Sequence, residues 1–350
     1  MSSFFDKIIN QKSPYIIAEI GSNHNGDTDL ALRLINSAYK SGAHCVKFQS
    51  WSKETIFARS KYEENFFLED DYRSRNDYTL EEIVDTYSIS KSQLLEMKNY
   101  AESLSIDCSS TPFSFSEADF LVESLLSPFI KIASMDLNNL PFIKYLAKLG
   151  KPLILSTGLS ELHEIDRAVQ TIENEGCFEI IILHCVSTYP PIDKDVNLNN
   201  IQTLKSLYPE YPIGFSDHTI GFEIPLAAAA LGVSIIEKHF TLDKEMEGWD
   251  HKVSATEEDM RIIVQGSARI TSAMGDHRIR APESMDKKNE FRRSIVLARS
   301  MKVGEVLNKE DIDFKRPGRG ISPEWSDFVI GHKLNKDLPL DHILLKKDIT

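Results

Sequence analysis

Two histidines stand at the ends of two apolar runs in the second half of the chain. Residues 213–218 read IGFSDH and residues 235–239 read IIEKH, and a helical AAAAL stretch lies between them. A strand, a helix and a second strand in this order predict a βαβ unit, whose parallel strands are about 4.8 Å apart when adjacent. At the same level of such a pair, His218 and His239 could share one divalent ion and leave positions open for water and substrate.

Other apolar runs also contain or precede polar side chains, so the histidines do not stand alone. Lys47 and Lys131 are expected on the same face, together with the hydroxyl groups of Thr111, Ser134, Ser156, Ser187 and Ser216. Two cations and several hydroxyls suit a small phosphorylated carboxylate, because lysines neutralise its charge and hydroxyls fix its orientation. One lysine could instead be a Schiff-base nucleophile, which would make the protein an aldolase.

The apolar runs indicate the fold class, since eight of them alternate with helical patterns. The runs cover residues 15–20, 45–49, 106–110, 129–134, 153–158, 179–185, 213–217 and 235–240. Amphipathic stretches between them include residues 29–40, 91–104, 141–149, 161–172 and 224–231. Alternating strands and helices predict a parallel sheet, and eight such units favour a (β/α)8 TIM barrel over a doubly wound open sheet. In a barrel the carboxyl ends of the strands meet at the face where active sites are built.

The pattern changes after Met274, where GDHRIRAPESMDKKNE is polar and has the composition of a linker. We therefore expect a catalytic barrel over residues 1–275, a linker over 276–290 and a small, mostly β module over 291–350. Such a module is too small to be a catalytic domain alone, so we expect it to serve substrate contact or oligomerisation. Residues 51–90 form a long charged insertion, which is either a solvated excursion or a lid or subunit contact.

Composition excludes several classes of protein. The chain has 350 residues and a formal net charge of −13, which argues against nucleic acid as a partner. No run approaches the ~18 apolar residues of a membrane span, and the first residues lack an apolar targeting segment, so we expect neither membrane insertion nor export. The four cysteines have no motif spacing and are expected to be reduced core thiols of a cytoplasmic protein: Cys45, Cys108, Cys177 and Cys185.

Eight short motifs follow one another along the chain: IIAEIGSNHNGD, VKFQ, SSTPFS, KIAS, LILSTGLS, LHCVSTYP, GFSDHTIG and IEKHFT. In this order they resemble the sialic acid synthase family, and the tail VGEVLNKEDIDFKRPGRGI resembles the antifreeze-like (SAF) domain of that family. The resemblance runs from about residue 15 to the C-terminus. It implies the condensation of phosphoenolpyruvate with the open-chain aldehyde of a 2-acetamido hexose, which gives a nine-carbon 2-keto acid and inorganic phosphate.

The resemblance also implies roles for individual residues. His218 and His239 would hold the divalent ion, with Mn²⁺ as the first choice and Mg²⁺ or Co²⁺ as alternatives, and the ion would polarise the aldehyde. Phosphoenolpyruvate would be held by Lys47, Thr111, Lys131, Ser134, Ser156, Ser187 and Ser216. The implied sugar contacts are Gln49, Tyr189, Asp250 and Arg316. Glu19 would orient or activate a water molecule held by the ion, and the candidates for catalysis are Glu19, Lys47, Tyr189 and Asp250.

Arg316 has a further implication for assembly. Within KRPG it resembles the arginine that the small domain of one subunit inserts into the barrel of its partner, which implies a domain-swapped homodimer. Asp217 and Glu237, next to the histidines, are interpreted as salt-bridged or supporting groups rather than ligands. His24 in SNHNG is typical of the family, and shaping the loop is an alternative role for it.

Two positions depart from the family pattern and leave the identity of the sugar open. Ser187 stands where sialic acid synthases often carry Asn, and Trp249 is bulkier than the usual Pro beside Asp250. The acceptor is therefore either N-acetylmannosamine or a 2,4-diacetamido-trideoxyhexose, which would lead to a legionaminic- or pseudaminic-type acid.

Three rival functions remain. The first is a lysine-dependent aldolase on the same barrel. The second is a metal-dependent hydrolase, although such barrels usually carry an H-x-H pair at the first strand, which here ends in AEIGSNH. The third is a non-catalytic sugar- or phosphate-binding protein, which would have no reason to keep the complete set of Glu19, Lys47, Lys131, His218 and His239.

Overall fold

The computed structural model describes residues 3–64 and 79–350 and divides the chain into two compact units. The units are Met1–Gly275 and Asp276–Thr350, and each has a hydrophobic core of its own. In the described ranges no helix has the length and apolar character needed to cross a membrane.

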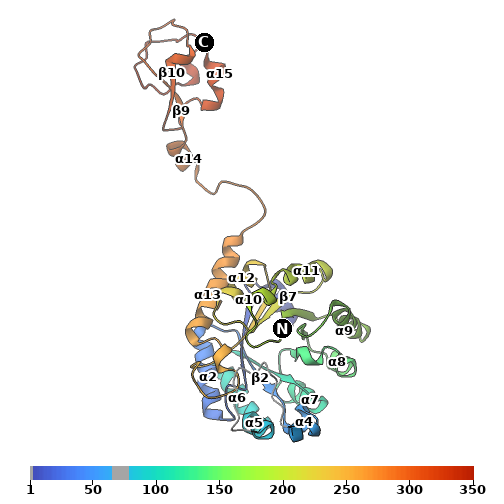
Figure 1. Ribbon diagram of the computed structural model, residues 1–350. Helices are drawn as coiled ribbons and strands as arrows, with labels where there is room; N and C mark the ends of the chain where they lie inside the picture. Colours follow the sequence, from blue (N-terminus) through green and yellow to red (C-terminus); the bar gives the residue numbers. More distant parts are fainter. Residues whose placement is uncertain (1–2, 65–78) are drawn as a thin grey trace. The chain divides into compact units, whose positions relative to one another are not determined.

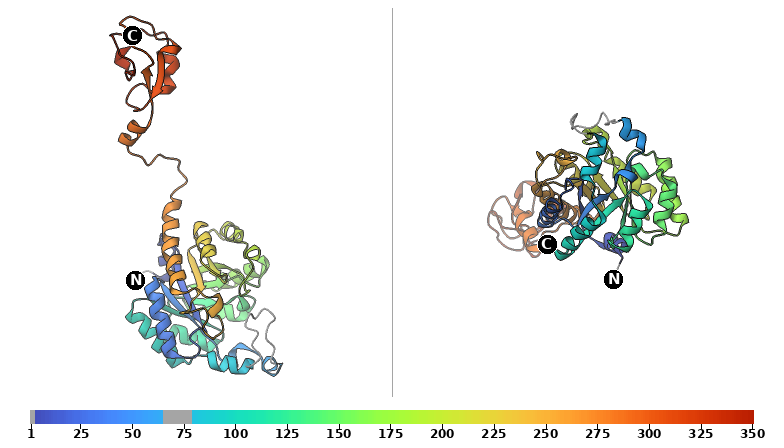
Figure 2. Two further views of the ribbon diagram at one scale, coloured as in Figure 1. Left: turned by 60° about the vertical axis from the view of Figure 1, so that its left-hand side comes forward. Right: turned by 90° about the horizontal axis from the view of Figure 1, so that it is seen from below.

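The first unit is a barrel of eight parallel strands (Figures 1 and 2). The strands are β1 (Tyr15–Gly21), β2 (Cys45–Ser50), β3 (Asp107–Pro112), β4 (Ile130–Ile132), β5 (Leu153–Ser156), β6 (Ile180–Cys185), β7 (Ile213–Asp217) and β8 (Ile235–His239). They are hydrogen-bonded in the order β3-β2-β1-β8-β7-β6-β5-β4, so that the first strand pairs with the last. Because an open doubly wound sheet does not pair its first and last strands, the predicted barrel is confirmed over that alternative.

Helices surround the strands in Figure 1. In this unit they are α1 (Phe4–Asn10), α2 (Thr28–Ser41), α3 (Lys53–Ile56), α4 (Arg59–Glu64), α5 (Leu80–Tyr87), α6 (Lys91–Ser103), α7 (Phe115–Glu123), α8 (Leu140–Ala147), α9 (Leu162–Asn174), α10 (Asp193–Val196), α11 (Asn199–Leu207), α12 (Glu223–Ala230) and α13 (Glu257–Met274). In α2 the buried Leu30, Leu34 and Ala38 recur at helical spacing and face the barrel core. All five helices predicted from amphipathic patterns are present, with ends shifted by one or two residues.

Serine side chains bridge the two strands at the ends of the hydrogen-bonded order. The Ser127 hydroxyl, just before β4, donates to the Phe129 carbonyl at 2.7 Å and is 2.8 Å from the Ser109 hydroxyl on β3. Ser109 in turn donates to the same carbonyl at 3.4 Å. These three residues are fully buried, so their hydrogen bonds close the barrel where no backbone ladder joins β3 to β4.

The amino ends of the strands are filled by apolar side chains. Tyr15, Phe129 and other inward-facing residues form a buried cluster, and α1 packs Phe4 and Ile8 against it. The Phe4 ring lies 5.3 Å from the Tyr15 ring and 4.7 Å from the Phe129 ring, measured between centroids. The helix therefore plugs this end of the barrel, and the opposite end is left for the site.

Residues 51–90 contain α3, α4 and α5, and residues 65–78 within them lie outside the described ranges. The second unit contains α14 (Met285–Phe291), β9 (Ser294–Leu297), β10 (Ile312–Lys315) and α15 (Ser326–Val329). β9 and β10 are antiparallel, and isolated bridges such as Met301–Leu338 extend the pairing. The unit is thus the small, mostly β module expected from the sequence, and α14 occupies part of the segment expected to be a linker.

Candidate active site

A cavity of about 450 Å³ lies at the carboxyl ends of the barrel strands. It is lined by thirteen of the fourteen residues that the sequence indicated as site residues: Glu19, Lys47, Gln49, Thr111, Lys131, Ser134, Ser156, Ser187, Tyr189, Ser216, His218, His239 and Asp250. The fourteenth, Arg316, belongs to the second unit. The barrel therefore gathers residues from both ends of a 275-residue unit into one site.

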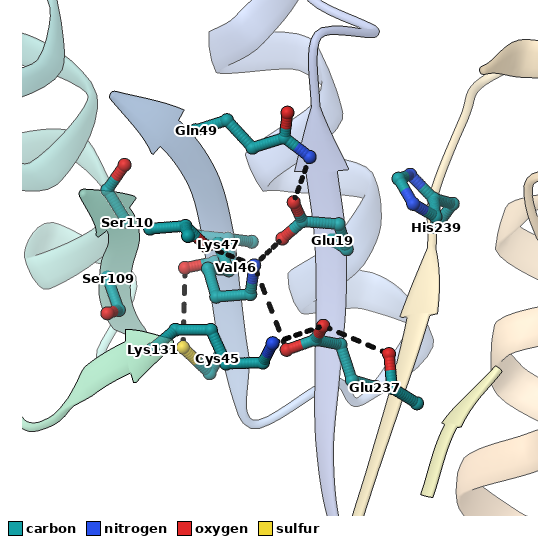
Figure 3. Close-up of polar contacts among 12 residues, drawn as sticks. Glu19, Cys45, Val46, Lys47, Gln49, Ser109, Ser110, Lys131, Glu237 and His239 are labelled. Atoms are coloured by element: carbon teal, nitrogen blue, oxygen red, sulfur yellow. Dashed lines mark hydrogen bonds and ion pairs between the residues drawn. The ribbon is translucent and has the colours of Figure 1, made fainter. Parts of the chain in front are cut away.

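Two lysines and two carboxylates from four strands form an ionic floor in this cavity (Figure 3). The Nζ atom of Lys47 is 2.6 Å from Oε2 of Glu19 and 3.7 Å from Oε2 of Glu237. The Nζ atom of Lys131 is 3.7 Å from Oε1 of Glu237. All four side chains are almost fully buried, so each charge depends on an opposite charge or a hydrogen bond for its stability.

The protonation states within the ionic floor differ. Burial, opposed by Lys47 and reinforced by Glu237, raises the pKa of Glu19 to about 7. For Glu237 the two lysines outweigh the effect of burial and lower the pKa. Burial lowers the pKa of Lys131 despite Glu237, whereas Glu19 and Glu237 raise the pKa of Lys47 against burial. Glu19 is therefore the member of the floor whose charge changes near neutral pH.

Hydroxyl groups hold the lysines of the ionic floor. Lys47 donates to Oγ1 of Thr111 at 2.9 Å, and Lys131 donates to Oγ of Ser156 at 2.6 Å. Each hydroxyl comes from the strand next in sequence to that of its lysine, β3 for Lys47 and β5 for Lys131. The ammonium groups are therefore fixed in position and need little rearrangement to receive an anion.

Ser134 and Ser187 meet beside Gly158. The Gly158 N–H donates to Oγ of Ser134 at 3.1 Å, and a Cβ atom at residue 158 would collide with both hydroxyls. A larger residue at this position would therefore displace the two hydroxyls from their places beside the backbone. Ser216 completes the group of hydroxyls, since it donates to Oε1 of Glu237 at 3.3 Å.

His218 and His239 face each other with ring centroids 5.5 Å apart. Nδ1 of His218 is 2.7 Å from the Val186 carbonyl, which accepts, so Nδ1 carries a proton. Burial lowers the pKa of His218, but Cys185 and the Val186 carbonyl outweigh it and raise this pKa above its usual value. Nδ1 of His239 is buried without a hydrogen-bond partner and lies 3.9 Å from Oδ2 of Asp250. Burial and the neighbouring His218 hold the pKa of His239 well below its usual value, so this ring is neutral at pH 7.

This pair of histidines fits a divalent ion. A ligating histidine commonly donates its other ring N–H to a carbonyl, as His218 does to Val186, and an ion at Nε2 of His218 would replace a proton there. The orphaned nitrogen of His239 gives a second donor. Within the described ranges no group of three or more His, Cys, Asp or Glu side chains is arranged to hold an ion, so water and substrate oxygens would complete the coordination. An open nitrogen and oxygen site of this kind suits Mn²⁺, Co²⁺ or Mg²⁺.

The predicted sugar contacts border the histidines and the ionic floor. The Tyr189 ring lies 4.0 Å from the His218 ring and 5.8 Å from the His239 ring, measured between centroids. Gln49 donates to Oε1 of Glu19 at 3.0 Å and accepts from Nε1 of Trp51, also at 3.0 Å. These contacts orient each side chain before any substrate binds.

Asp250 lies on the loop after β8, and Asn23 ties this loop to the loop after β1. The fully buried Asn23 side chain donates to the Phe240 carbonyl at 2.9 Å and to Oγ of Ser254 at 2.8 Å. Its Oδ1 accepts from the Asp250 N–H at 3.2 Å, and Ser22 donates to the Asp250 carboxylate at 3.3 Å. The SNHN segment therefore positions Asp250. His24 is buried and accepts from the Gly26 N–H at 2.9 Å, so it shapes the same loop.

Glu237 and Cys185 line the cavity although the sequence analysis gave neither a role in binding or catalysis. Glu237 is two residues from His239, and this period of two puts both side chains on the inner face of β8. The intervening Lys238 points the other way and pairs with Asp217 at 2.5 Å, which confirms that Asp217 is salt-bridged. Cys185 is the buried, free thiol that the sequence predicted, and it also borders the cavity. Burial raises its pKa, but His218, Ser134 and Lys131 outweigh this and lower it to about 7.

Comparison with known proteins identifies the family. The NeuB family model matches residues 34–279, and the SAF domain model matches residues 292–350. The chain belongs to the NeuB family. The resemblance to sialic acid synthases with an antifreeze-like domain is therefore confirmed.

Several known proteins are similar to this chain over most of its length. An uncharacterized protein of Methanocaldococcus jannaschii is 41% identical over 98% of this chain and 97% of its own length. The N,N'-diacetyllegionaminic acid synthase of Campylobacter jejuni is 37% identical over 95% of this chain and 99% of its own. The crystal structure of an N-acetylneuraminic acid synthetase from Leptospira borgpetersenii is similar with a TM-score of 0.70, at 35% identity, over 79% of this chain and 90% of that one. The named relatives are synthases of nonulosonic acids, and this chain is an enzyme of that type.

Proposed function

We propose that the protein condenses phosphoenolpyruvate with an open-chain N-acetylated amino hexose to give a nine-carbon 2-keto acid and phosphate. The observation that supports this most is the combination, in one cavity of a NeuB family member, of two buried lysines with a facing pair of histidines. Lysines suit a phosphorylated carboxylate, and a facing pair of histidines suits an ion that binds an aldehyde oxygen.

Phosphoenolpyruvate would bind above the ionic floor. Lys47 and Lys131 would face its anionic groups, and the hydroxyls of Thr111 and Ser156, with the other serines of the cavity, would fix its orientation. The floor also holds two carboxylates, so an incoming anion meets repulsion unless one of them is protonated. Glu19, whose pKa is about 7, can take up that proton at neutral pH and leave Lys47 to the substrate.

The aldehyde of the sugar would lie at His218 and His239. The ion, Mn²⁺ as the first choice, would act as a Lewis acid toward the carbonyl oxygen when bound. Tyr189, Gln49 and Asp250 would hold the hydroxyl and acetamido groups, so that the aldehyde carbon faces the methylene carbon of phosphoenolpyruvate.

The reaction balances in two steps. In the first, the methylene carbon of phosphoenolpyruvate forms a bond to the aldehyde carbon, the aldehyde oxygen takes the proton of Glu19 and becomes a hydroxyl, and C2 of the former phosphoenolpyruvate unit becomes cationic. In the second, water adds to C2 of the former phosphoenolpyruvate unit, and the C2–O bond to phosphate breaks as the keto group forms. Glu19, which is 3.0 Å from Gln49 and 2.6 Å from Lys47, would be ionised after the first step, and it would then hold the attacking water and accept its proton.

The same proposal includes a domain-swapped homodimer, in which Arg316 of one subunit reaches the sugar in the barrel of its partner. The support is the KRPG match within a segment that belongs to the SAF domain. Arg316→Ala is expected to raise the sugar KM more than the phosphoenolpyruvate KM. Sedimentation of the wild-type protein as a monomer would argue against the swap.

The deciding experiment is phosphate release from phosphoenolpyruvate by the purified protein. We would measure it with Mn²⁺, with Mg²⁺ or Co²⁺ and after chelation, across N-acetylmannosamine and 2,4-diacetamido-trideoxyhexoses. Release that requires both metal and sugar is expected. No release from a folded, metal-loaded sample with any of these sugars would contradict the proposed function.

The lowered pKa of Lys131 favours one second candidate, a Schiff-base aldolase. This alternative predicts that chelation leaves activity intact and that borohydride traps substrate carbon on Lys131 or Lys47. Mass spectrometry of the borohydride-treated protein separates the two mechanisms, and the condensation predicts an unmodified lysine.

A further inference from the structure

A carboxylate outside the cavity connects the segments that follow β2 and β3. Glu117 lies in the first turn of α7 and is buried. Its Oε1 accepts a hydrogen bond from the Thr55 hydroxyl of α3 at 2.9 Å, and its Oε2 accepts one from the Phe113 N–H at 2.7 Å. Both donors lie beyond Ser50 and Pro112, the last pair of the β2–β3 ladder. One side chain therefore joins these segments where the backbone ladder has ended.

The burial of Glu117 is costly and has to be compensated. A carboxylate is expensive to bury unless its oxygens accept hydrogen bonds. Burial raises the pKa of Glu117, although the Phe113 N–H and the Thr55 hydroxyl oppose this. The helix α7 does not require the burial, since Ser114 caps it and an acidic residue in the first turn is favourable from an exposed position as well. What the two buried oxygens hold therefore explains their position better than helix stability does.

A series of hydrogen bonds leads from Glu117 to a predicted sugar contact. Oγ1 of Thr55 accepts from the Ser52 N–H at 2.9 Å, which fixes the backbone directly after Trp51. Nε1 of Trp51 donates to Oε1 of Gln49 at 3.0 Å, and Gln49 in turn donates to a carboxylate of the ionic floor at 3.0 Å. The Gln49 amide is thus held between the floor and Trp51, and Trp51 is anchored through α3 to Glu117.

Residues on both sides of this connection line the cavity, although Glu117 itself does not. On the β2 side they are Trp51, Ile56 and Phe57, and on the β3 side Phe113. The four belong to one hydrophobic cluster. Apolar packing holds such segments together but is not directional, so the hydrogen bonds to the buried carboxylate set how one segment lies against the other.

We propose that Glu117 is a positioning residue of the active site. Its carboxylate holds the start of the insertion against the end of β3 and thereby keeps Trp51 and Gln49 in place on the sugar side of the cavity. The part that concerns the sugar rests on the proposed function, because Gln49 contacts the sugar only in that proposal. The phosphoenolpyruvate side has separate supports, since Thr111 and Ser156 hold the two lysines. Loss of Glu117 therefore acts on one substrate.

The first test is the split between the two substrates, measured as phosphate release with each substrate varied in turn. Glu117→Ala removes both acceptors, and we expect the sugar KM to rise about tenfold while the phosphoenolpyruvate KM stays within about twofold. Glu117→Gln should restore most of the loss, because its carbonyl oxygen can accept from the Phe113 N–H and its amide can donate to Oγ1 of Thr55. An equal rise in both KM values, or a glutamine variant as impaired as the alanine variant, would overturn the inference.

Thr55 allows the same connection to be broken from its other end. Thr55→Val removes the hydroxyl with little change of shape, and Thr55 is half-buried, so this variant carries the test if Glu117→Ala does not fold. It should also raise the sugar KM, and the double variant should be no worse than Glu117→Ala, because both changes break one connection. Asp119→Ala is the matched control, since Asp119 lies on the same helix and accepts from the Tyr145 hydroxyl, away from the cavity. An unchanged sugar KM in Thr55→Val, or an equal rise in Asp119→Ala, would contradict the assignment.

A measurement without substrates separates failure of the inference from failure of the proposed function. Trp51 is 5% exposed, and in a Trp249→Phe, Trp325→Phe background it is the one tryptophan left in the chain. We expect acrylamide to quench its fluorescence several-fold faster in Glu117→Ala than in the background protein or in Asp119→Ala. Faster quenching in a protein that releases no phosphate would support the positioning role and remove the proposed reaction. Unchanged quenching would overturn the inference whatever the turnover.

Discussion

The inside of the barrel has two levels with opposite chemistry, although both are built from the same strands. At the lower level the inward side chains are apolar: Ile17, Cys45, Phe129, Ile154, Leu183 and Ile235. Two residues further along each strand they are polar or ionisable: Glu19, Lys47, Lys131, Ser156, Cys185 and Glu237. Side chains of a strand alternate with a period of two, so the next inward-facing residue lies about 6.6 Å further along the strand. That distance separates the apolar level from the polar level.

The difference between the levels lies in what fixes each side chain. At the lower level, α1 and the neighbouring side chains fill the space, and close packing sets the positions. At the upper level, ion pairs and hydrogen bonds set them, as between Lys47 and Glu19 at 2.6 Å. Buried charges stabilise a fold poorly. The upper level therefore depends on the lower level for its rigidity, and it contributes function rather than stability.

The largest expected effect comes from the histidines above the ionic floor. His239→Ala should lower kcat by at least about a thousandfold, because it removes the orphaned nitrogen expected to hold the ion. The melting temperature should change little, since His239 takes no part in the lower-level packing and its Nδ1 atom is 3.9 Å from Oδ2 of Asp250, too far for a hydrogen bond. Calorimetry with Mn²⁺ should show lost metal binding. Normal turnover by the variant after rigorous metal removal would rule out the ion.

A pair of substitutions on neighbouring strands tests the two levels directly. Ile154→Ala should lower the free energy of unfolding by about 2–5 kcal/mol and leave kcat/KM of the folded protein within a few-fold. Lys131→Met should do the reverse, with a loss of about a hundredfold in kcat/KM for phosphoenolpyruvate. Its change in stability should be small, because Lys47, 3.7 Å from Glu237, still compensates that carboxylate. Denaturant unfolding and phosphate release measure both quantities for both variants.

If the two variants lost activity and stability in the same proportion, the levels would not be separate. Ser156 is two residues beyond Ile154 and accepts from Lys131, so a shift of β5 is the one route by which Ile154→Ala could reduce activity. Restored activity in Ile154→Val, which removes a single methylene group, would identify that route.

The two levels also differ in how far the sequence predicts them. The lower level and the barrel follow from local pattern, because eight short apolar runs each become one strand. Residues at strand ends, such as Lys47 and His218, were predictable for the same reason. Their partners were not: Glu237 is adjacent in sequence to Lys238, yet it pairs across the barrel with Lys47 and Lys131. Such contacts depend on barrel closure, which no short segment encodes.

Loops were the least predictable part. The SNHN segment was recognisable as a motif. Its hydrogen bonds to the loop around Asp250, however, join residues more than 200 positions apart in the sequence, and no local pattern predicts them. The sequence likewise did not predict that Ile56 and Val84, from the insertion over residues 51–90, line the cavity. The part of this insertion over residues 65–78 lies outside the described ranges.

A smaller effect is expected from pH, through Glu19. Its pKa of about 7 means that it is protonated below this pH and anionic above it. The anionic form holds Lys47 and repels phosphoenolpyruvate, so affinity should be full below pH 7. Above pH 7 the Kd should rise by up to about tenfold per pH unit. Titration calorimetry of wild type and Glu19→Gln between pH 6 and 9 measures this. An equal rise in both would assign the pH dependence to another group.

The smallest expected effect lies above both levels, in the loops. Asn23→Ala removes two donated hydrogen bonds and the acceptor for the Asp250 N–H, so the loop after β8 loses its anchor to β1. Because Asp250 faces the sugar side of the cavity, we expect the acceptor KM to rise about fivefold with the phosphoenolpyruvate KM unchanged. Steady-state kinetics with each substrate varied in turn measures the split.

Asn139→Ala is the matched control for this last prediction. Asn139 also accepts a hydrogen bond from the backbone, as the N-cap of α8, but it does not line the cavity. It should cost stability, about 1 kcal/mol for a lost cap, and leave both KM values in place. Should Asn23→Ala raise the two KM values equally, the loop would act on the ionic floor as well. The site would then be one rigid unit rather than a floor with a separately positioned sugar contact.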